Sequence, residues 1–140
     1  MSEEQAQQLL QQMQMLENLF AQLTQKENSL INIIREANSA IHSIKGVSTQ
    51  PECDSLVPLG IGTFMRSKVS SNEKIIINVG SGVAIEKNHS DALNYLESRL
   101  KELEIALQDT NKQRQQIAAN LEQGKQQMQN FMQTSQNTTK

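Results

Sequence analysis

Two glycine pairs have a spacing that could serve phosphate binding. Gly60 and Gly62 flank a single residue, and Gly80 and Gly82 repeat the same spacing later in the chain. A dinucleotide site needs a third glycine and a following helix, and a P-loop needs Lys beside Ser or Thr. Here each pair is followed by another strand-like segment. We therefore interpret both pairs as bends between strands.

Histidine, cysteine and acidic residues form no pattern that could hold a metal or catalyse a reaction. His42 and His89 lie on different expected elements, without Cys or carboxylate residues at ligand spacing. Cys53 is the single cysteine, which excludes an intrachain disulfide and is typical of a reducing compartment. Charges between residues 97 and 104 alternate as on a solvated helix face. We predict that the chain is not an enzyme and uses no cofactor or metal.

The composition limits the class of protein and its partners. The chain has 140 residues and a formal charge of −2, which gives no electrostatic reason to expect nucleic acid or an anionic membrane as partner. No apolar run approaches the roughly 20 residues that span a bilayer, and the first residues, Met-Ser-Glu-Glu, differ from a signal peptide. We expect a soluble, cytoplasmic protein. Aromatic residues make up 3%, which favours extended helices over a large globular core.

Residues 56–87 are expected to form the β structure. Short runs rich in Val and Ile are separated by Gly and Ser, and two similar runs follow one another. This pattern predicts two hairpins and about four strands, and Pro58 indicates that the first strand lies at an edge or starts irregularly. The alternation places Ile75, Ile77 and Val79 on one face, and also Val83 and Ile85 if the register continues through the glycines. The residues assigned to oligomerisation are Val57, Leu59, Ile75, Ile77, Val79, Val83 and Ile85.

Heptad periodicity flanks this β region on both sides and predicts two long helices. In residues 1–45 the seam steps through Leu9, Gln12, Leu16, Leu19, Leu23, Lys26, Leu30, Ile33, Ala37, Ala40 and Ile44, and Met13, Phe20, Ile34 and Ile41 widen it on one flank. In residues 90–132 it steps through Leu93, Leu96, Leu100, Leu103, Leu107, Thr110, Arg114, Ile117, Leu121, Gly124, Met128 and Phe131.

The remaining segments complete the predicted organisation. Residues 46–55 lack a period and contain Ser, Thr, Gln and Pro, which is typical of a linker. Residues 133–140 also lack a period, and we expect a tail without structure. The prediction is a single α+β domain, 1–140, in which a long antiparallel two-helix coiled coil is joined by two hairpins.

Polar residues interrupt both seams at about the same height in the antiparallel pairing. Lys26 interrupts the first seam, and Thr110 with Arg114 interrupts the second. This coincidence predicts a polar layer that fixes the register, with Glu27 as partner of Arg114. The alternative is two unrelated interruptions whose charges reach outward to water.

The same pairing brings the two chain ends together, with Leu9 facing Met128. Methionine is frequent at this end, and its flexible side chain adapts to many apolar partners. Gly124, opposite Gln12, is expected to loosen the helix pair there. The residues assigned to binding at this end are Leu9, Leu10, Met13, Met15, Leu16, Met128, Phe131 and Met132. The alternative is that they are ordinary coiled-coil residues beside a frayed end without function.

The apolar face of the β region needs cover that this chain does not supply. A two-helix coiled coil uses its single apolar stripe on its own partner helix. Two small hairpins are marginally stable alone, so β structure shared between subunits is the expected solution. The sequence therefore predicts an obligate oligomer.

Three segments in this order resemble the archaeal prefoldin alpha subunit. They are LVPLGIGTFM at residues 56–65, INVGSGVAIEK at 77–87 and DALNYLESRLKELE at 91–104. Ile61 departs from the pattern, because the family often has a third glycine at this position. The resemblance covers nearly the whole chain.

The resemblance implies a hexameric chaperone of two alpha and four beta subunits. Its strands join into β barrels, and its coiled coils hold unfolded polypeptides between their tips. Such a holdase works without ATP and delivers its clients to a group II chaperonin. The alternative function is that of a structural coiled-coil adaptor that does not bind clients.

Overall fold

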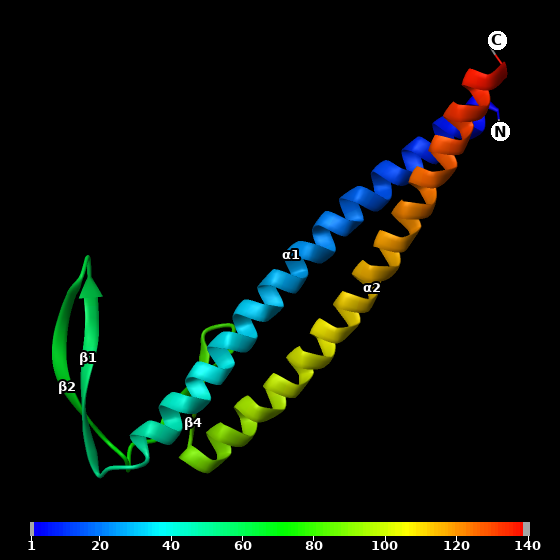
Figure 1. Cartoon of the computed structure of the whole chain (residues 1–140). Helices are drawn as coiled ribbons and strands as arrows, with labels where there is room; N and C mark the ends of the chain where they lie inside the picture. The colour runs from blue at the N-terminus through cyan, green and yellow to red at the C-terminus, as the bar shows by residue number, and fades with distance from the viewer. Residues whose placement is uncertain (1, 139–140) are drawn as a thin grey trace. The chain divides into compact units, whose positions relative to one another are not determined.

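A computed structural model describes residues 2–138 of the chain. The elements in order are α1 (Glu3–Val47), β1 (Glu52–Gly60), β2 (Thr63–Ser70), β3 (Ile75–Gly80), β4 (Val83–Lys87) and α2 (His89–Thr138). Two long helices thus enclose four strands in sequence, and the helices run antiparallel (Figure 1). The predicted α+β fold of a two-helix coiled coil with two hairpins is confirmed.

The chain separates into two compact units. Unit 1 contains α1 as far as Asn32 and α2 from Glu104 onward, and unit 2 runs from Ile33 to Leu103 and contains both hairpins. Each helix contributes residues to both units. The single domain, 1–140, remains a prediction. In unit 1 the start of α1 and the end of α2 lie at the same end (Figure 1).

Side chains define the two ends of α1. The amide of Ser2 donates to Oε1 of Gln5 over 3.0 Å, and the amide of Gln5 donates to Oγ of Ser2 over 3.3 Å. This reciprocal pair is a capping box, which satisfies amides at the helix start. At the other end, the Ser48 hydroxyl donates to the Ile44 carbonyl over 2.8 Å. The helix therefore continues past the predicted end at residue 45, to Val47.

The limits of α2 differ from the predicted range 90–132. The helix begins at His89 because Asn88 caps it: the Asp91 amide donates to Oδ1 of Asn88 over 2.7 Å. At the other end the predicted tail is wrong as far as Thr138, since residues 133–138 are helical. Adding a residue to an existing helix costs little, because no new nucleus is needed. Residues 139–140 of the predicted tail lie outside the described residues.

Each pair of consecutive strands forms its own antiparallel two-stranded sheet. In the first hairpin Val57 pairs with Met65, and in the second Ile77 pairs with Ile85. The predicted linker 46–55 is too long, because β1 already begins at Glu52. The pairing extends back to Glu52 because β2 continues opposite this part of β1. Lys68 of β2 lies across from Asp54 of β1. Opposite charges across strands stabilise such a pair.

Both hairpins turn through the glycine pairs in the same way. The backbone φ is +46° at Ile61 and +71° at Gly62, and it is +53° at Ser81 and +74° at Gly82. Positive φ at both central residues is the requirement of a type I′ turn, whose twist matches the flanking strands. The prediction that both glycine pairs are bends between strands is confirmed, as is the similarity of the two hairpins.

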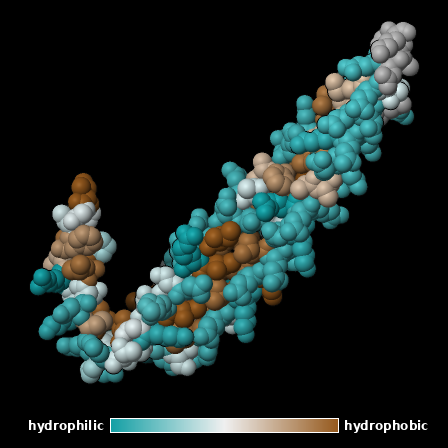
Figure 2. All heavy atoms as spheres, viewed as in Figure 1, coloured by the Kyte–Doolittle hydropathy of each residue, from teal (hydrophilic) through white to brown (hydrophobic). Residues whose placement is uncertain are grey.

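The buried core is small and lies between the helices. The buried residues are Ala6, Met13, Leu23, Ala37, Ile44, Ala92, Thr110 and Gly124, all of them in α1 or α2. No described strand residue is buried. The apolar side chains of both hairpins are therefore exposed or half-buried within the described chain, and the tip of the β1–β2 hairpin is visibly hydrophobic (Figure 2).

Candidate functional site

At four positions of the predicted α1 seam, the next residue in the sequence is the more buried one. Gln12, Leu19, Lys26 and Ile33 are exposed, and their neighbours Met13, Phe20, Glu27 and Ile34 are buried or half-buried instead. The predicted flank of the seam is thus part of the seam itself. The physical reason is that the observed seam is more apolar than the predicted one. Met13 takes the place of polar Gln12, and the other three exchanges hardly change the apolar character of the seam.

The predicted seam of α2 agrees with the observed burial. All twelve predicted positions, from Leu93 to Phe131, are buried or half-buried. In unit 1 a shallow groove is lined by Leu9 and Leu16 of α1 together with Asn120 and Gln123 of α2. This arrangement fits the predicted antiparallel register.

Gly124 packs against Met13, the neighbour of the predicted Gln12, and Gln12 lines the same groove as Gly124. A β-carbon placed on Gly124 would lie 3.0 Å from Cγ and 3.1 Å from Sδ of Met13. The glycine therefore makes room for the methionine side chain, which is only 9% exposed. The expectation that Gly124 loosens the helix pair is not supported by this packing, because the seam is closed at this point.

Three of the eight proposed binding residues are exposed apolar side chains of unit 1. Leu10 is 48% exposed, Met15 is 71% exposed and Met132 is 57% exposed. Met15 also lines a groove of about 470 Å³ on one side of α1, together with Gln12, Leu16 and Leu19. We call the exposed apolar residues Leu10, Met15, Leu19 and Met132 together the end patch, although Leu10 and Leu19 lie on opposite sides of α1. Leu19 belongs to it because it is 41% exposed beside Met15, whereas the sequence placed it in the seam.

The other five proposed binding residues contribute to the helix pairing. Met13 is buried, and Leu9, Leu16, Met128 and Phe131 are half-buried. Phe131 also borders a groove of about 250 Å³ that it shares with Met132, Ser135 and Gln136. The eight residues thus divide into a solvent-facing group and a seam group.

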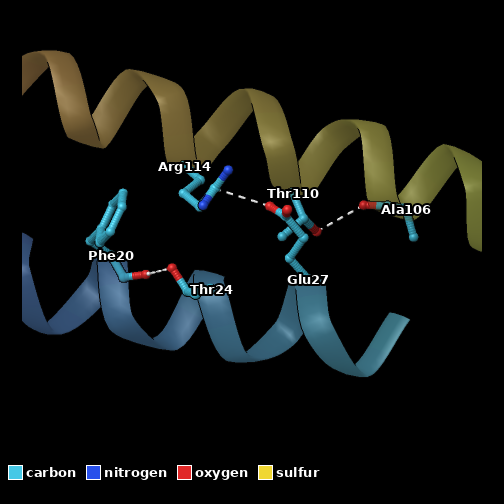
Figure 3. Close-up of polar contacts among 6 residues, drawn as sticks. All are labelled: Phe20, Thr24, Glu27, Ala106, Thr110 and Arg114. Atoms are coloured by element: carbon cyan, nitrogen blue, oxygen red, sulfur yellow. Dashed lines mark hydrogen bonds and ion pairs between the residues drawn. The ribbon is translucent and has the colours of Figure 1, made fainter. Parts of the chain in front are cut away.

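A polar layer crosses the helix pair of unit 1 (Figure 3). Nε of Arg114 lies 3.0 Å from Oε2 of Glu27, and the exposed fractions of the two side chains are 31% and 16%. These two atoms are shielded from solvent but not aligned for a hydrogen bond, so the contact is a coulombic ion pair. The guanidinium carbon also lies 5.8 Å from the centre of the Phe20 ring, within cation–π range.

Thr110 completes this layer at the centre of the seam. Its side chain is 2% exposed, and its hydroxyl donates to the Ala106 carbonyl over 2.8 Å (Figure 3). The buried hydroxyl is therefore satisfied within its own helix. The predicted pair of Glu27 with Arg114 is present, but Glu27 takes the seam position that was predicted for Lys26.

The two hairpins differ in how their apolar side chains are distributed. In β3–β4, Ile75, Ile77 and Ile85 lie on one face, because Ile77 and Ile85 are paired directly and Ile75 is two residues from Ile77. In β1–β2, the pair Val57–Met65 lies on one face and Leu56 lies on the other. All three of these β1–β2 residues are at least 45% exposed.

The sequence prediction missed the second apolar face of β1–β2. Pro58 pairs with Phe64 on the same face as Leu56, and Phe64 is 56% exposed. Leu56, Phe64, Met65 and Ile76 were not among the proposed oligomerisation residues. The signal was present in the sequence, because residues 56–59 and 64–65 are consecutive apolar residues and not an alternating pattern.

The described residues contain no group of three or more His, Cys, Asp or Glu side chains placed to hold a metal ion. His89 bridges polar atoms of unit 2: Nδ1 lies 2.6 Å from Oγ of Ser48, and Nε2 lies 2.9 Å from the Glu73 carbonyl oxygen. Neither helix in the described range is long and apolar enough to cross a membrane.

Comparison with known proteins identifies the family. The family model for prefoldin subunits matches residues 9–134. The chain belongs to the prefoldin family. The prefoldin subunit alpha of Nitrosopumilus maritimus is 55% identical over 97% of this chain and 94% of that protein. The prefoldin subunit alpha of Methanoregula boonei is 36% identical over 60% of each chain.

Solved prefoldin structures share the fold. A filamentous PFD from Methanocaldococcus jannaschii matches with a TM-score of 0.67 and 22% identity, covering 79% of this chain and 92% of that one. The prefoldin beta subunit from Thermococcus strain KS-1 matches with a TM-score of 0.65 and 16% identity, covering 91% of each. The predicted resemblance to the archaeal prefoldin alpha subunit is confirmed, and the chain is a chaperone subunit.

Proposed function

We propose that this prefoldin subunit is part of an ATP-independent holdase that captures unfolded polypeptides. In this proposal two copies of the chain and four beta subunits form a hexamer in the cytoplasm, and the hexamer delivers its clients to a group II chaperonin. The observation that carries the proposal is the end patch, which combines exposed Met and Leu side chains where α1 starts and α2 ends.

The end patch has the chemistry that binding of varied apolar segments requires. Methionine side chains are flexible and polarizable, so they can pack against many shapes. Met15 and Met132 are more than half exposed, although a solvent-exposed position on a helix does not need an apolar residue. We propose that Leu10, Met15 and Met132 contact a client first. Leu9, Met13, Leu16, Met128 and Phe131 would contact it only where the helix pair opens.

Assembly through the hairpins is the second part of the proposal. The proposed oligomerisation residues Val57, Leu59, Val79, Val83 and Ile85 are each at least 37% exposed, and Ile75 and Ile77 are half-buried. Full burial of a Val or Ile side chain is worth about 1.5–3 kcal/mol, so covering this surface would favour association strongly. We propose that strands of neighbouring subunits cover it.

Aggregation suppression tests the client-binding part. The triple variant Leu10→Gln, Met15→Gln, Met132→Gln keeps helix-compatible residues at exposed positions, so it should assemble like the native chain. The assembled complex is mixed with a denatured model protein on dilution, and light scattering is recorded without ATP. We expect the triple variant to lose most of the suppression.

A matched control separates client binding from general surface hydrophobicity. Ile105 is 60% exposed in α2 but lies outside the end patch, and Ile105→Gln should suppress aggregation like the native chain. Full suppression by the triple variant would favour the adaptor alternative. Delivery is tested separately by adding a group II chaperonin to the loaded complex and measuring transfer of a labelled client.

A further inference from the structure

In unit 1, helix α1 has two stripes that could each pack on α2. Both contain the same leucine column, which consists of Leu9, Leu16 and Leu23. The observed stripe adds the residue four positions after each leucine, which gives Met13, Phe20 and Glu27. The rejected stripe adds the residue three positions after each leucine, which gives Gln12, Leu19 and Lys26. Consecutive helix residues are about 100° apart, so a rotation of α1 by about 50° would exchange the two stripes.

The contact of Met13 with Gly124 favours the observed stripe near the chain ends. A β-carbon on Gly124 would lie 3.0 Å from Cγ of Met13, so the glycine leaves space for this side chain. In the rotated helix Gln12 would occupy the same space. The amide of glutamine would lose its hydrogen bonds to water there, whereas burial of methionine is favourable.

The ion pair of Glu27 with Arg114 favours the same stripe two heptads further along α1. Oε2 of Glu27 lies 3.0 Å from Nε of Arg114, and Lys26 is exposed. In the rotated helix Lys26 would face Arg114 instead, and two cations would repel each other in a partly shielded seam. The rotation of α1 in unit 1 therefore depends on Arg114 as well as on Gly124.

The rotation decides which apolar side chains of α1 face solvent. As observed, Met15 and Leu19 line the groove on the free side of α1, and Phe20 is half-buried. Leu19 and Phe20 are both apolar, so this pair alone barely discriminates between the two rotations. The rotated helix would withdraw Leu19 into the seam and expose Phe20. The surface available to a client thus differs between the two rotations.

We propose that Gly124 and Arg114 of α2 are positioning residues for client binding. Through their contacts in the seam they hold α1 in one rotation, and so they keep Met15 and Leu19 of the end patch in solvent. A helix with two apolar stripes would otherwise populate both rotations. The effect on clients rests on the proposed function, whereas the rotation is a property of the helix pair and is measured separately.

An exchange variant of unchanged composition tests the positioning role. Gln12→Met with Met13→Gln, and Lys26→Glu with Glu27→Lys, move both contacts to the rejected stripe. The same helix-forming residues are retained, so the complex with beta subunits should keep its native circular dichroism.

Hydroxyl-radical footprinting with peptide mass spectrometry reports the rotation, with Met132 of α2 as the internal reference. We expect modification of Leu19 to fall about fourfold in the exchange variant, because Leu19 is 41% exposed and the buried seam residue Met13 is 9% exposed. Modification of Phe20 should rise at the same time.

Rotation and loosening of the seam give different footprints. A native footprint of the exchange variant would overturn the positioning role, and so would a rise at both Leu19 and Phe20, which indicates an open seam. Arg114→Glu reverses one charge of α2 and should move the two signals in the same opposite directions by a smaller factor. This variant decides the question if the exchange variant does not fold.

The control exchanges two exposed residues of α1 that lie outside both stripes. Glu17→Asn with Asn18→Glu also keeps the composition, and its footprint should be native. Footprint changes in this control as large as those in the exchange variant would show that the two contacts do not select the rotation.

Light scattering of a denatured model protein separates this inference from the proposed function. The exchange variant should suppress aggregation less than the native complex, because Leu19 leaves the surface and Met15 moves toward the seam. A native footprint with normal suppression refutes the positioning role and leaves the proposed function intact. A rotated footprint with normal suppression supports control of the rotation by Gly124 and Arg114 but refutes Met15 and Leu19 as client contacts.

Discussion

Met13 packs directly on Gly124, with its Cγ 3.0 Å from the position that a β-carbon on residue 124 would occupy. A glycine inside a helix usually costs about 1 kcal/mol relative to alanine. Here the absent side chain lets the two helices hold a large methionine between them. The relationship makes the seam of unit 1 tight close to the end patch.

This packing predicts a strong coupling between the two positions. Gly124→Ala in the native background should gain no stability, because the helix propensity gained is offset by the clash with Met13. In a Met13→Ala background the same change should stabilise the protein by about 1 kcal/mol. Thermal unfolding of the four members of this double-mutant cycle measures the coupling. Equal effects of Gly124→Ala in both backgrounds would contradict the contact.

The ion pair of Glu27 and Arg114 should respond asymmetrically to mutation. Glu27→Ala leaves a partly buried guanidinium without its partner and should destabilise the protein by about 1–3 kcal/mol. Replacing both residues with Leu should be neutral or stabilising, because it removes both charges from the seam. Urea unfolding monitored by helical circular dichroism gives these values. A double variant less stable than Glu27→Ala would argue against this account.

Oxidation should distinguish the methionines of the end patch from the methionine of the seam. Met15 is 71% exposed and Met132 is 57% exposed, whereas Met13 is 9% exposed. Mild hydrogen peroxide should therefore convert Met15 and Met132 to sulfoxide well before Met13. Peptide mass spectrometry gives the order of modification. Loss of aggregation suppression should follow modification of the exposed pair, and early oxidation of Met13 would indicate an open seam.

His89 should stabilise the junction where α1 ends and α2 begins. Its ring connects Ser48 with the Glu73 carbonyl, so His89→Ala removes two polar contacts of unit 2. We expect a loss of about 0.5–1.5 kcal/mol per contact and faster hydrogen exchange at residues 46–50 and 88–92. His42→Ala, at an exposed position of α1, is the control and should exchange like the native chain.

The heptad pattern predicted α2 well and α1 only partly. In α2 most neighbours of the seam positions are polar, so one assignment is clearly best. In α1 two stripes are apolar at once, since Leu19 and Ile33 compete with Phe20 and Ile34. Only the partner helix decides between them, and Arg114 favours the stripe that contains Glu27. Leu19 belongs to the stripe that lies outside the seam, and it is part of the end patch.

The hairpins were predictable from their turns, whereas their full extent and surfaces were not. The repeated glycine pairs specified two similar turns, and both are present. The start of β1 at Glu52 depends on the partner strand, because Glu52 and Asp54 have low intrinsic strand preference. The second apolar face of β1–β2 was missed because alternation was assumed, although this hairpin is apolar on both sides near its tip.

The two sheets have two strands each, and among the described residues no strand pairs with a strand of the other hairpin. Every strand is thus an edge strand, with backbone amides and carbonyls free to template further chains. We therefore expect the chain to associate through these strand edges when no other subunit covers them.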